Sequence, residues 1–257
     1  MSLYCLSCFF PSNFRFLSAA RDIKAGEVIL EEDFLTRCPP YSTLPICLGC
    51  YIFIDKSNYI NCPTCNWPMC SDTCCKAPDH LLECALFKEA NFKVDTEKFN
   101  FDTFEPLYDV LTPLRALSFR KSCPDKWKIF LELMSHEEDW KSTENWIEEH
   151  KPASDFILGL KLKNVDQQLI WKIFGICYTN EFSTKVNDAR VRLTYRKVAM
   201  LSHDCTPNVT RYLSGFGQNN KIKIMAIKDI VAGEKLAITY VDVVLPGLIR
   251  RDILRKV

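Results

Sequence analysis

Cysteine and histidine residues stand in four closely spaced pairs in the first third of the chain. Two or three residues separate the members of each pair, so both side chains can reach one metal ion from a single turn of backbone. Zinc is tetrahedral and takes thiolate and imidazole ligands, so eight ligands fill two closed sites and leave no open position for a catalytic water. We therefore predict two structural zinc ions in a segment that folds only with its metal. The predicted ligands are Cys47, Cys50, Cys62, Cys65, Cys70, Cys74, His80 and Cys84.

The overall cysteine count supports metal binding over disulfides. The chain holds 14 cysteines among 257 residues, with 8 glycines and 13 prolines. In a short secreted domain this would indicate disulfides, whereas in an intracellular protein it more often indicates metal. The low glycine count argues against a disulfide scaffold built from loops, and buried free cysteines would not explain four regular pairs. The spacing assigns no role to Cys5, Cys8, Cys38, Cys75, Cys123 and Cys177.

A second group of residues that could do chemistry lies near the end of the sequence. The segment 202–208 contains a histidine beside a predicted strand, and the segment 233–240 ends in a tyrosine. By pattern alone, both side chains also have a structural interpretation. A histidine beside a strand usually makes its hydrogen bonds within the fold, and a tyrosine at a strand end can belong to the core. The pattern leaves these interpretations open beside a catalytic one.

The two segments resemble the signature motifs of SET-domain lysine methyltransferases. S-H-D-C-T-P-N at 202–208 is similar to the pattern N-H-S-C-x-P-N, and G-E-K-L-A-I-T-Y at 233–240 is similar to G-E-x-L-x-x-x-Y. The spacing of the cysteine and histidine pairs resembles that of the MYND zinc finger. A β-hairpin, this finger, a helical insert and the two motifs follow in the order of the SET and MYND domain (SMYD) family. The resemblance covers nearly the whole chain.

The resemblance implies an α+β fold, a SET-domain β-fold of small sheets interrupted by a MYND-type finger and a helical insert. Because the family's finger cross-braces its ligands, Cys47, Cys50, Cys70 and Cys74 would hold one ion, and Cys62, Cys65, His80 and Cys84 the other. The implied segments are the N-terminal part of the SET domain (1–46), the finger (47–84), the helical insert (85–175), the C-terminal SET core (176–243) and a truncated lead into a post-SET segment (244–257).

The activity implied is transfer of a methyl group from S-adenosylmethionine to the ε-amine of a lysine in a protein substrate, with histones as one candidate. The lysine must be neutral when it attacks, although its ordinary pKa is about 10.4. A dry, narrow channel favours the neutral form and aligns the nitrogen with the methyl group. Tyr240 matches the catalytic tyrosine, and Asn208 is expected to fix its loop. The positions implied to bind the cofactor are Arg15, Asn180, Ala199, Ser202 and His203.

The sequence departs from the family at three places. Phe14-Arg15-Phe16 stands where the family has a glycine-rich G-x-G that wraps the cofactor with backbone, and glycine permits a closer approach. Ser202 replaces an asparagine, while Asp204 and Ala199 replace serines. The partners of Cys205 in a third zinc site, a C-x-C-x-x-C segment, do not follow the second motif. We therefore expect either a fragment or a protein without the lid that this segment forms.

These departures motivate an alternative function beside the methyltransferase, which we favour. The chain would then be a catalytically impaired SET and MYND scaffold that acts as a zinc-dependent protein-interaction module or transcriptional regulator. A zinc hydrolase is a poor third hypothesis because both zinc sites are closed. MYND fingers often bind proline-rich peptides, so the resemblance implies a protein substrate or a peptide partner, in the cytoplasm, the nucleus or both.

Net charge and hydropathy exclude some classes of binding partner. The chain has 33 Lys+Arg and 32 Asp+Glu, a formal net charge of +1. It therefore lacks the electrostatic footprint of a protein that binds nucleic acid or an anionic membrane. No apolar run reaches the ~18 residues of a membrane span. The apolar segment 3–10 lacks the basic residues of a signal peptide, and we expect it to be part of the first strand or a frayed terminus.

Hydrophobic periodicity predicts the elements that position these residues. Residues 15–35 predict a strand, a turn and a strand, and residues 85–175 predict helices. Alternation predicts strands at 209–212 and 221–224 around a turn at 215–220, and an apolar run predicts a last strand at 235–240.

Two further patterns bear on the organisation of the chain. The motif D-I-x-A-G-E at 22–27 recurs at 229–234, so we expect similar turns at the two ends of one interrupted β-domain. The stretch 131–150 carries seven acids against one lysine. We favour a solvated helical face there over a docking site for a basic peptide.

Overall fold

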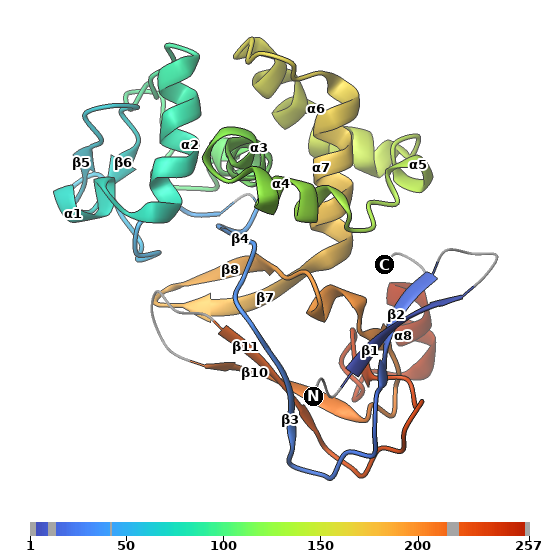
Figure 1. Ribbon diagram of the computed structural model, residues 1–257. Helices are drawn as coiled ribbons and strands as arrows, with labels where there is room; N and C mark the ends of the chain where they lie inside the picture. The colour runs from blue at the N-terminus through green and yellow to red at the C-terminus, as the bar shows by residue number, and fades with distance from the viewer. Residues whose placement is uncertain (1–3, 10–13, 42, 215–220, 255–257) are drawn as a thin grey trace. The chain divides into compact units, whose positions relative to one another are not determined.

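The computed structural model describes residues 4–9, 14–41, 43–214 and 221–254 (Figure 1). Its chain contacts divide it into two compact units. The first unit combines Met1–Phe34 with Tyr195–Val257, and the second is Leu35–Thr194. Both units mix helices with small sheets, so the predicted α+β class is confirmed. The domain boundaries expected from the sequence stay a prediction beside this division.

The first unit contains three small sheets among its described residues. Its elements are β1 (Tyr4–Phe9), β2 (Phe14–Ala19), β3 (Val28–Glu32), η2 (Val198–Met200), β9 (Ser202–His203), β10 (Val209–Ser214), β11 (Lys221–Ala226), β12 (Ala237–Ile238) and α8 (Gly247–Leu254). β1 pairs with β2, β9 pairs in parallel with β12, and β11 lies between β10 and β3. Ile222, Ile224 and Ala226 of β11 are buried, which confirms the period-two alternation there.

The strand, turn and strand predicted within 15–35 are confirmed, but the two strands do not pair with each other. In the described part of the chain, β2 pairs with β1 and β3 pairs with β11. The intervening turn bonds to a distant segment instead, because Ile23 and Ile230 exchange backbone hydrogen bonds of 2.8 and 2.9 Å. Backbone groups need hydrogen-bond partners, but these need not be close in the sequence.

The last predicted strand, 235–240, is shorter than expected and covers Ala237–Ile238. The predicted turn at 215–220 lies outside the described residues.

The two copies of the repeated motif face each other in the first unit. Asp22 accepts a hydrogen bond from the Ala232 N–H at 2.8 Å, and Asp229 accepts one from the Ala25 N–H at 3.0 Å. The glycines of the two copies have φ of 87° and 84°, a left-handed conformation that glycine adopts without strain. The repeat therefore marks two loops that cap each other.

The second unit combines helices with a three-stranded sheet of order β4-β8-β7 and a small β5-β6 pair. Its elements are β4 (Thr36–Cys38), β5 (Ile60–Asn61), β6 (Pro68–Met69), α1 (Asp72–Cys75), α2 (Pro78–Glu89), η1 (Pro106–Val110), α3 (Leu111–Ser122), α4 (Pro124–Leu131), α5 (Glu137–Trp140), α6 (Glu144–Gly159), α7 (Gln167–Asn180), β7 (Glu181–Val186) and β8 (Ala189–Thr194). In Figure 1, α7 leads directly into β7. The Leu35 N–H bonds the Thr194 carbonyl at 2.7 Å, so the first and last residues of this unit lie side by side.

The central helix of the second unit is α3. It contacts α2, α4, α7 and β4, and every residue from Leu111 to Phe119 is buried, as expected for a helix that has neighbours on all sides. One of these residues, Arg115, carries a charge although only 1% of it is exposed. The indole of Trp67, from the finger, packs 6.1 Å from Phe87 and 5.3 Å from Tyr108. The finger and the helical insert therefore share one core.

The helices predicted within 85–175 are confirmed. Six of the seven acidic side chains in the stretch 131–150 are exposed, as a solvated face requires, and the choice of a solvated face over a docking site for a basic peptide stays a prediction. Among the described residues, no helix has both the length and the apolar character needed to cross a membrane. The acidic side chains that lie at least partly exposed in this stretch are Glu132, Glu137, Glu138, Asp139, Glu144, Glu148 and Glu149.

Candidate functional site

Two turns of matching geometry carry the first half of the predicted metal ligands. In each turn, the carbonyl of the first cysteine accepts a hydrogen bond of 2.8 Å from the residue four positions later, Tyr51 or Asn66. The N–H of the same cysteine donates at 2.9 Å to the carbonyl five positions later. Tyr51 and Asn66 have φ of 63° and 62°, so both turns close through the left-handed region. The paired cysteines of these turns are Cys47 with Cys50 and Cys62 with Cys65.

Helices carry three of the other four predicted metal ligands. Cys74 lies on α1, whose N-cap Ser71 accepts a hydrogen bond from the Cys74 N–H at 3.3 Å. His80 and Cys84 lie on α2, which has a proline at its first position, a favoured place because the missing N–H would have no helical partner. A separation of four residues puts both ligands on one face of the helix.

The eight predicted ligands converge into two groups, and within each group all ligand atoms lie within 4.8 Å of one another. The Sγ atoms of Cys50 and Cys70 are 3.5 Å apart, and Cys65 Sγ is 3.7 Å from His80 Nε2. A tetrahedral zinc with Zn–S bonds of ~2.3 Å spaces its ligands by roughly 3.5–3.8 Å. Both groups therefore fit a closed, structural zinc ion, and they are the two sets that cross-bracing implies. The four-cysteine site consists of Cys47, Cys50, Cys70 and Cys74, and the histidine-containing site consists of Cys62, Cys65, His80 and Cys84.

Gly49 allows the four-cysteine site to close. A Cβ built on Gly49 would lie 2.7 Å from the Cβ of Cys74 and 2.8 Å from its Cα. Carbon atoms do not approach so closely, so a side chain at this position would push the first turn away from α1. The close approach of α1 thus requires glycine at position 49, between the first two cysteine ligands.

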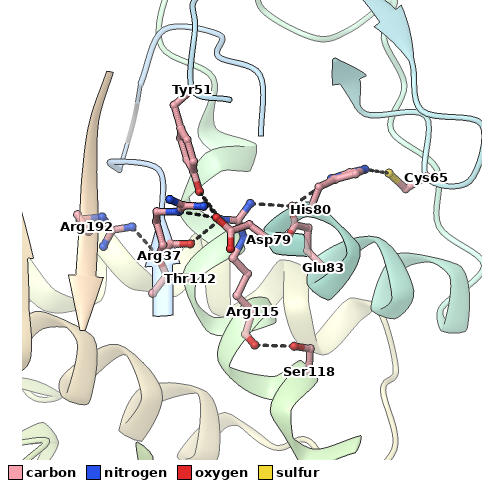
Figure 2. A network of polar contacts seen from close by, with 10 residues as sticks. All are labelled: Arg37, Tyr51, Cys65, Asp79, His80, Glu83, Thr112, Arg115, Ser118 and Arg192. Carbon is pink, nitrogen blue, oxygen red and sulfur yellow. Dashed lines mark hydrogen bonds and ion pairs between the residues drawn. The ribbon is translucent and has the colours of Figure 1, made fainter. Parts of the chain in front are cut away.

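The histidine-containing site is fully buried and adjoins a network of charged side chains (Figure 2). His80 Nδ1 lies 3.1 Å from the Glu83 carboxylate, which pairs with Arg115 of α3 at 2.7 Å. Asp79, the neighbour of His80, pairs with Arg37 at 2.6 Å. Ion pairs therefore connect this metal site to the helical insert and to β4.

The two SET-like motifs lie side by side in the first unit as a short parallel pair. Ala237 and Ile238 of β12 stand opposite Ser202 and His203 of β9. The N–H groups of Ser202 and Asp204 bond to carbonyls of residues 236 and 238. Because backbone groups alternate along a strand, the N–H and C=O of His203 point away from β12.

The rings of His203 and Tyr240 lie 5.4 Å apart. The Tyr240 N–H donates to His203 Nδ1 at 3.0 Å, so the proton of the neutral imidazole sits on Nε2, which is 3.4 Å from Cys205 Sγ. Burial lowers the pKa of His203 and so favours the neutral ring. The Tyr240 hydroxyl donates to the Leu201 carbonyl, and burial raises the pKa of Tyr240. The hydroxyl therefore stays protonated, and its oxygen can still accept a hydrogen bond.

Two polar side chains shape the loop of the first motif. Asp204 Oδ1 accepts hydrogen bonds from the N–H of Thr206 at 2.8 Å and from its hydroxyl at 3.0 Å, an Asx turn. Asn208 donates to the Lys235 carbonyl at 2.8 Å and accepts from the Ala237 N–H at 2.9 Å. The expectation that Asn208 fixes its loop is confirmed, and the aspartate that replaces the family's serine has a structural role of its own.

The other residues expected to bind the cofactor are distributed over both units. Ala199 is half-buried in η2, which contacts the strand β2 that contains Arg15. Asn180 ends α7 in the second unit and donates from its side-chain NH2 to the Ile176 carbonyl at 2.7 Å and the Met134 carbonyl at 2.6 Å. Both donor hydrogens of Asn180 thus serve the fold, and its Oδ1 is the atom left for a further contact.

Comparison with known families bears directly on these motifs. The family model described as SET domain matches residues 15–241. The chain belongs to the SET domain family. The family predicted from the two motifs is therefore confirmed.

Several curated relatives of this SET-domain chain carry SMYD names. The SET domain-containing protein SmydA-8 isoform A of Drosophila melanogaster is 25% identical over 92% of this chain and 50% of its own length. The N-lysine methyltransferase SMYD2-B of Danio rerio is 25% identical, over 95% and 56%. The histone-lysine N-methyltransferase SMYD3 of Mus musculus is 26% identical, over 93% and 55%. The chain thus spans about half the length of the curated relatives it matches.

Among solved structures, the crystal structure of the SET domain of LSMT bound to lysine and AdoHcy matches 93% of this chain and 49% of that chain. Its TM-score is 0.42 and its sequence identity 12%.

Sequence patterns do not predict three charged residues near these sites. The Glu32 carboxylate accepts hydrogen bonds from the backbone N–H groups of residues 196–198 and so holds the start of η2. Glu83 stands three positions after His80, and that helical spacing is a signal that could have found it. Arg115 is 32 positions away from its partner Glu83, so no local spacing points to it.

Proposed function

We propose that this chain is the SET and MYND part of a protein-lysine N-methyltransferase that uses S-adenosylmethionine. The SET domain match over residues 15–241 carries the proposal, and the pairing of the two motifs in β9 and β12 supports it. Relatives named as lysine methyltransferases support the reaction class. Histones are one candidate substrate.

Tyr240 is the proposed catalytic residue. S-adenosylmethionine supplies the methyl group when it is bound. The Tyr240 hydroxyl donates its hydrogen bond to the Leu201 carbonyl, so its oxygen lone pairs can accept an N–H of the incoming lysine and turn the amine lone pair toward the methyl group. The lysine must lose its own proton before it attacks, and a water-poor channel favours that loss.

The residues proposed to hold the cofactor are those that the family resemblance implies. His203 offers a backbone N–H and C=O that point away from β12. Asn180 offers Oδ1, because its NH2 group already bonds two carbonyls. The zinc ions would stabilise the second unit and take no part in methyl transfer, because all four positions of each site are filled by protein ligands. The proposed cofactor residues are Arg15, Asn180, Ala199, Ser202 and His203.

The test is calorimetric titration of S-adenosylmethionine into the zinc-loaded chain, followed by transfer of a labelled methyl group to histones and other proteins. We expect saturable binding, which Tyr240→Phe retains while it loses methyl transfer. Tyr212→Phe is the matched control, because Tyr212 is 53% exposed on β10. Absence of cofactor binding, or normal methyl transfer by Tyr240→Phe, would contradict the proposal.

A second candidate is a zinc-dependent interaction module without methyl transfer. β2 pairs with β1 without interruption through residues 14–16, where the family has a glycine-rich segment. This function predicts binding of a peptide, with proline-rich peptides as the first test, that survives Tyr240→Phe and is lost with Cys62→Ser. Methylation of any protein lysine by this chain would contradict it. For either function we propose a location in the cytoplasm, the nucleus or both.

A further inference from the structure

The histidine-containing site depends on a side chain outside the finger. Figure 2 shows the His80 ring with Cys65 on one side and Glu83 on the other. Its Nε2 lies 3.7 Å from Cys65 Sγ, and its Nδ1 lies 3.1 Å from Glu83 Oε1. The side chains of His80 and Glu83 are both 0% exposed. A histidine that gives one nitrogen to zinc needs an acceptor for the other N–H, and in this dry site Glu83 supplies it.

Arg115 of α3 in turn fixes the Glu83 carboxylate. Its Nε donates to Glu83 Oε2 at 2.7 Å, and its Nη2 donates to Oε1 at 2.9 Å. The two parallel hydrogen bonds, one to each oxygen, fix the orientation of the carboxylate plane. With a single hydrogen bond the carboxylate could still rotate. Glu83 Oε1 therefore has a fixed direction toward His80.

The remaining nitrogen of Arg115 reaches two other segments around the finger. Nη1 donates to the Tyr51 hydroxyl at 2.8 Å and to the Arg37 carbonyl. Tyr51 follows the ligand Cys50 directly and has φ of 63°, an uncommon conformation for a tyrosine that must be held by its surroundings. One guanidinium thus ties α2, the first cysteine turn and β4 to α3.

The charges favour an arginine in this position. A zinc ion with three thiolates and a neutral imidazole carries a net charge of −1. The Glu83 carboxylate adds a second negative charge next to it, and a buried charge of that kind is costly without a partner. Arg115, only 1% exposed, supplies the compensating charge and the donors in one group. A lysine would supply the positive charge, but its single ammonium group could not form the two parallel hydrogen bonds to the carboxylate oxygens.

We propose that Arg115 is a positioning residue of the histidine-containing site formed by Cys62, Cys65, His80 and Cys84. Through Glu83 it orients the His80 ring so that Nε2 faces the metal. The metal site therefore extends from the finger into the insert helix α3. The proposal concerns the metal alone and stands independently of methyl transfer.

The test is metal affinity of the full chain, measured site by site. Zinc competition with a chelator gives the affinity of each site, and Co²⁺ in place of zinc gives separate visible spectra for the four-cysteine site and the histidine-containing site. We expect Arg115→Lys to weaken zinc binding at the histidine-containing site by about 10–100-fold, the usual effect of losing an outer-shell partner. The Co²⁺ bands of that site should shift, and those of the four-cysteine site should stay.

A double variant separates positioning from a merely structural ion pair. Glu83→Gln/Arg115→Met removes both charges of the Glu83–Arg115 pair together and so leaves the net charge of the buried cluster unchanged. The unfolding free energy should therefore recover toward the wild-type value, while the histidine-containing site stays weak. Arg192→Lys is the matched control, because Arg192 makes an equally short pair of 2.7 Å with Glu181, 10% and 8% exposed, in the same unit. It should leave both sites unchanged. Wild-type affinity and spectra in both Arg115 variants, or equal loss at both sites, would overturn the proposal.

Discussion

We predict that the second unit loses stability between pH 7.5 and 5.5 because of His150. This residue lies on α6 and is 4% exposed. Its ring stacks on Phe174 at 4.6 Å and lies 4.1 Å from the Trp146 ring. Burial, together with the positive charge of Arg192, lowers the pKa of His150 to about 4, whereas in the unfolded chain it has the ordinary value of about 6.5.

The sign and size of the effect follow from this difference. The folded state holds His150 neutral, so its contribution to stability is present above pH 6.5 and is lost as the pH falls toward the folded-state pKa. Each unit of pKa difference corresponds to about 1.36 kcal/mol. The full loss is therefore roughly 3 kcal/mol, of which about 1.3 kcal/mol falls between pH 7.5 and 5.5.

The assay is urea unfolding of the zinc-loaded chain followed by tryptophan fluorescence. All 5 tryptophans lie between residues 35 and 194, so this signal reports the second unit alone. The control is His150→Phe, which keeps a ring against Phe174 and cannot take up a proton. Zinc content is measured at each pH, because protons compete with zinc for its ligands. An equal loss of stability in the wild type and in His150→Phe would refute the role of His150.

Three glycines give further predictions. In Gly175→Ala the new Cβ would collide with the Ser135 carbonyl oxygen, so we expect a loss of about 1–3 kcal/mol in urea unfolding, and an unchanged midpoint would contradict this. In Gly49→Ala the new Cβ would press on Cys74, so bound zinc should fall from two ions toward one, as elemental analysis would show. At Gly26, φ is 87° and a Cβ would meet no atom within 4 Å, so Gly26→Ala should cost only about 1–2 kcal/mol of backbone strain in thermal unfolding; a larger loss would indicate an additional contact.

Local spacing explains which parts of the site the sequence predicts. The metal ligands of each pair stand three or four positions apart, and a turn or one helical turn of that length has few conformations, so the pattern determines which residues can share an ion. The alternation in β11 works in the same way, because Ile222 and Ile224 must face one side of a strand. His203 and Tyr240 are predicted from motif resemblance alone. Their mutual contact arises because β9 and β12, which are far apart in the sequence, pair in the fold.

Long-range partners explain what the sequence does not predict. Arg115 lies in a helix whose other residues from 111 to 119 include polar types as well as apolar ones, and only the fold shows that the guanidinium is buried against Glu83. The strands within 15–35 stand close enough in sequence to pair with each other, yet β2 pairs with β1 and β3 pairs with β11. Periodicity predicts that a strand exists and which face is apolar, whereas the choice of partner strand depends on the whole chain.

The contact between Leu35 and Thr194 has a consequence for the order in which the chain folds. The capping loops at 22–27 and 229–234 are about two hundred positions apart, so an unfolded chain must close a very long loop to join them. Once residues 35–194 have folded, Leu35 and Thr194 lie side by side. The unfolded chain that still separates the two capping loops is then roughly four times shorter. Two halvings of loop length lower the closure entropy by roughly 1 kcal/mol. We therefore expect the zinc-containing unit to form first during synthesis, and β3 to pair only after β11 has been synthesised.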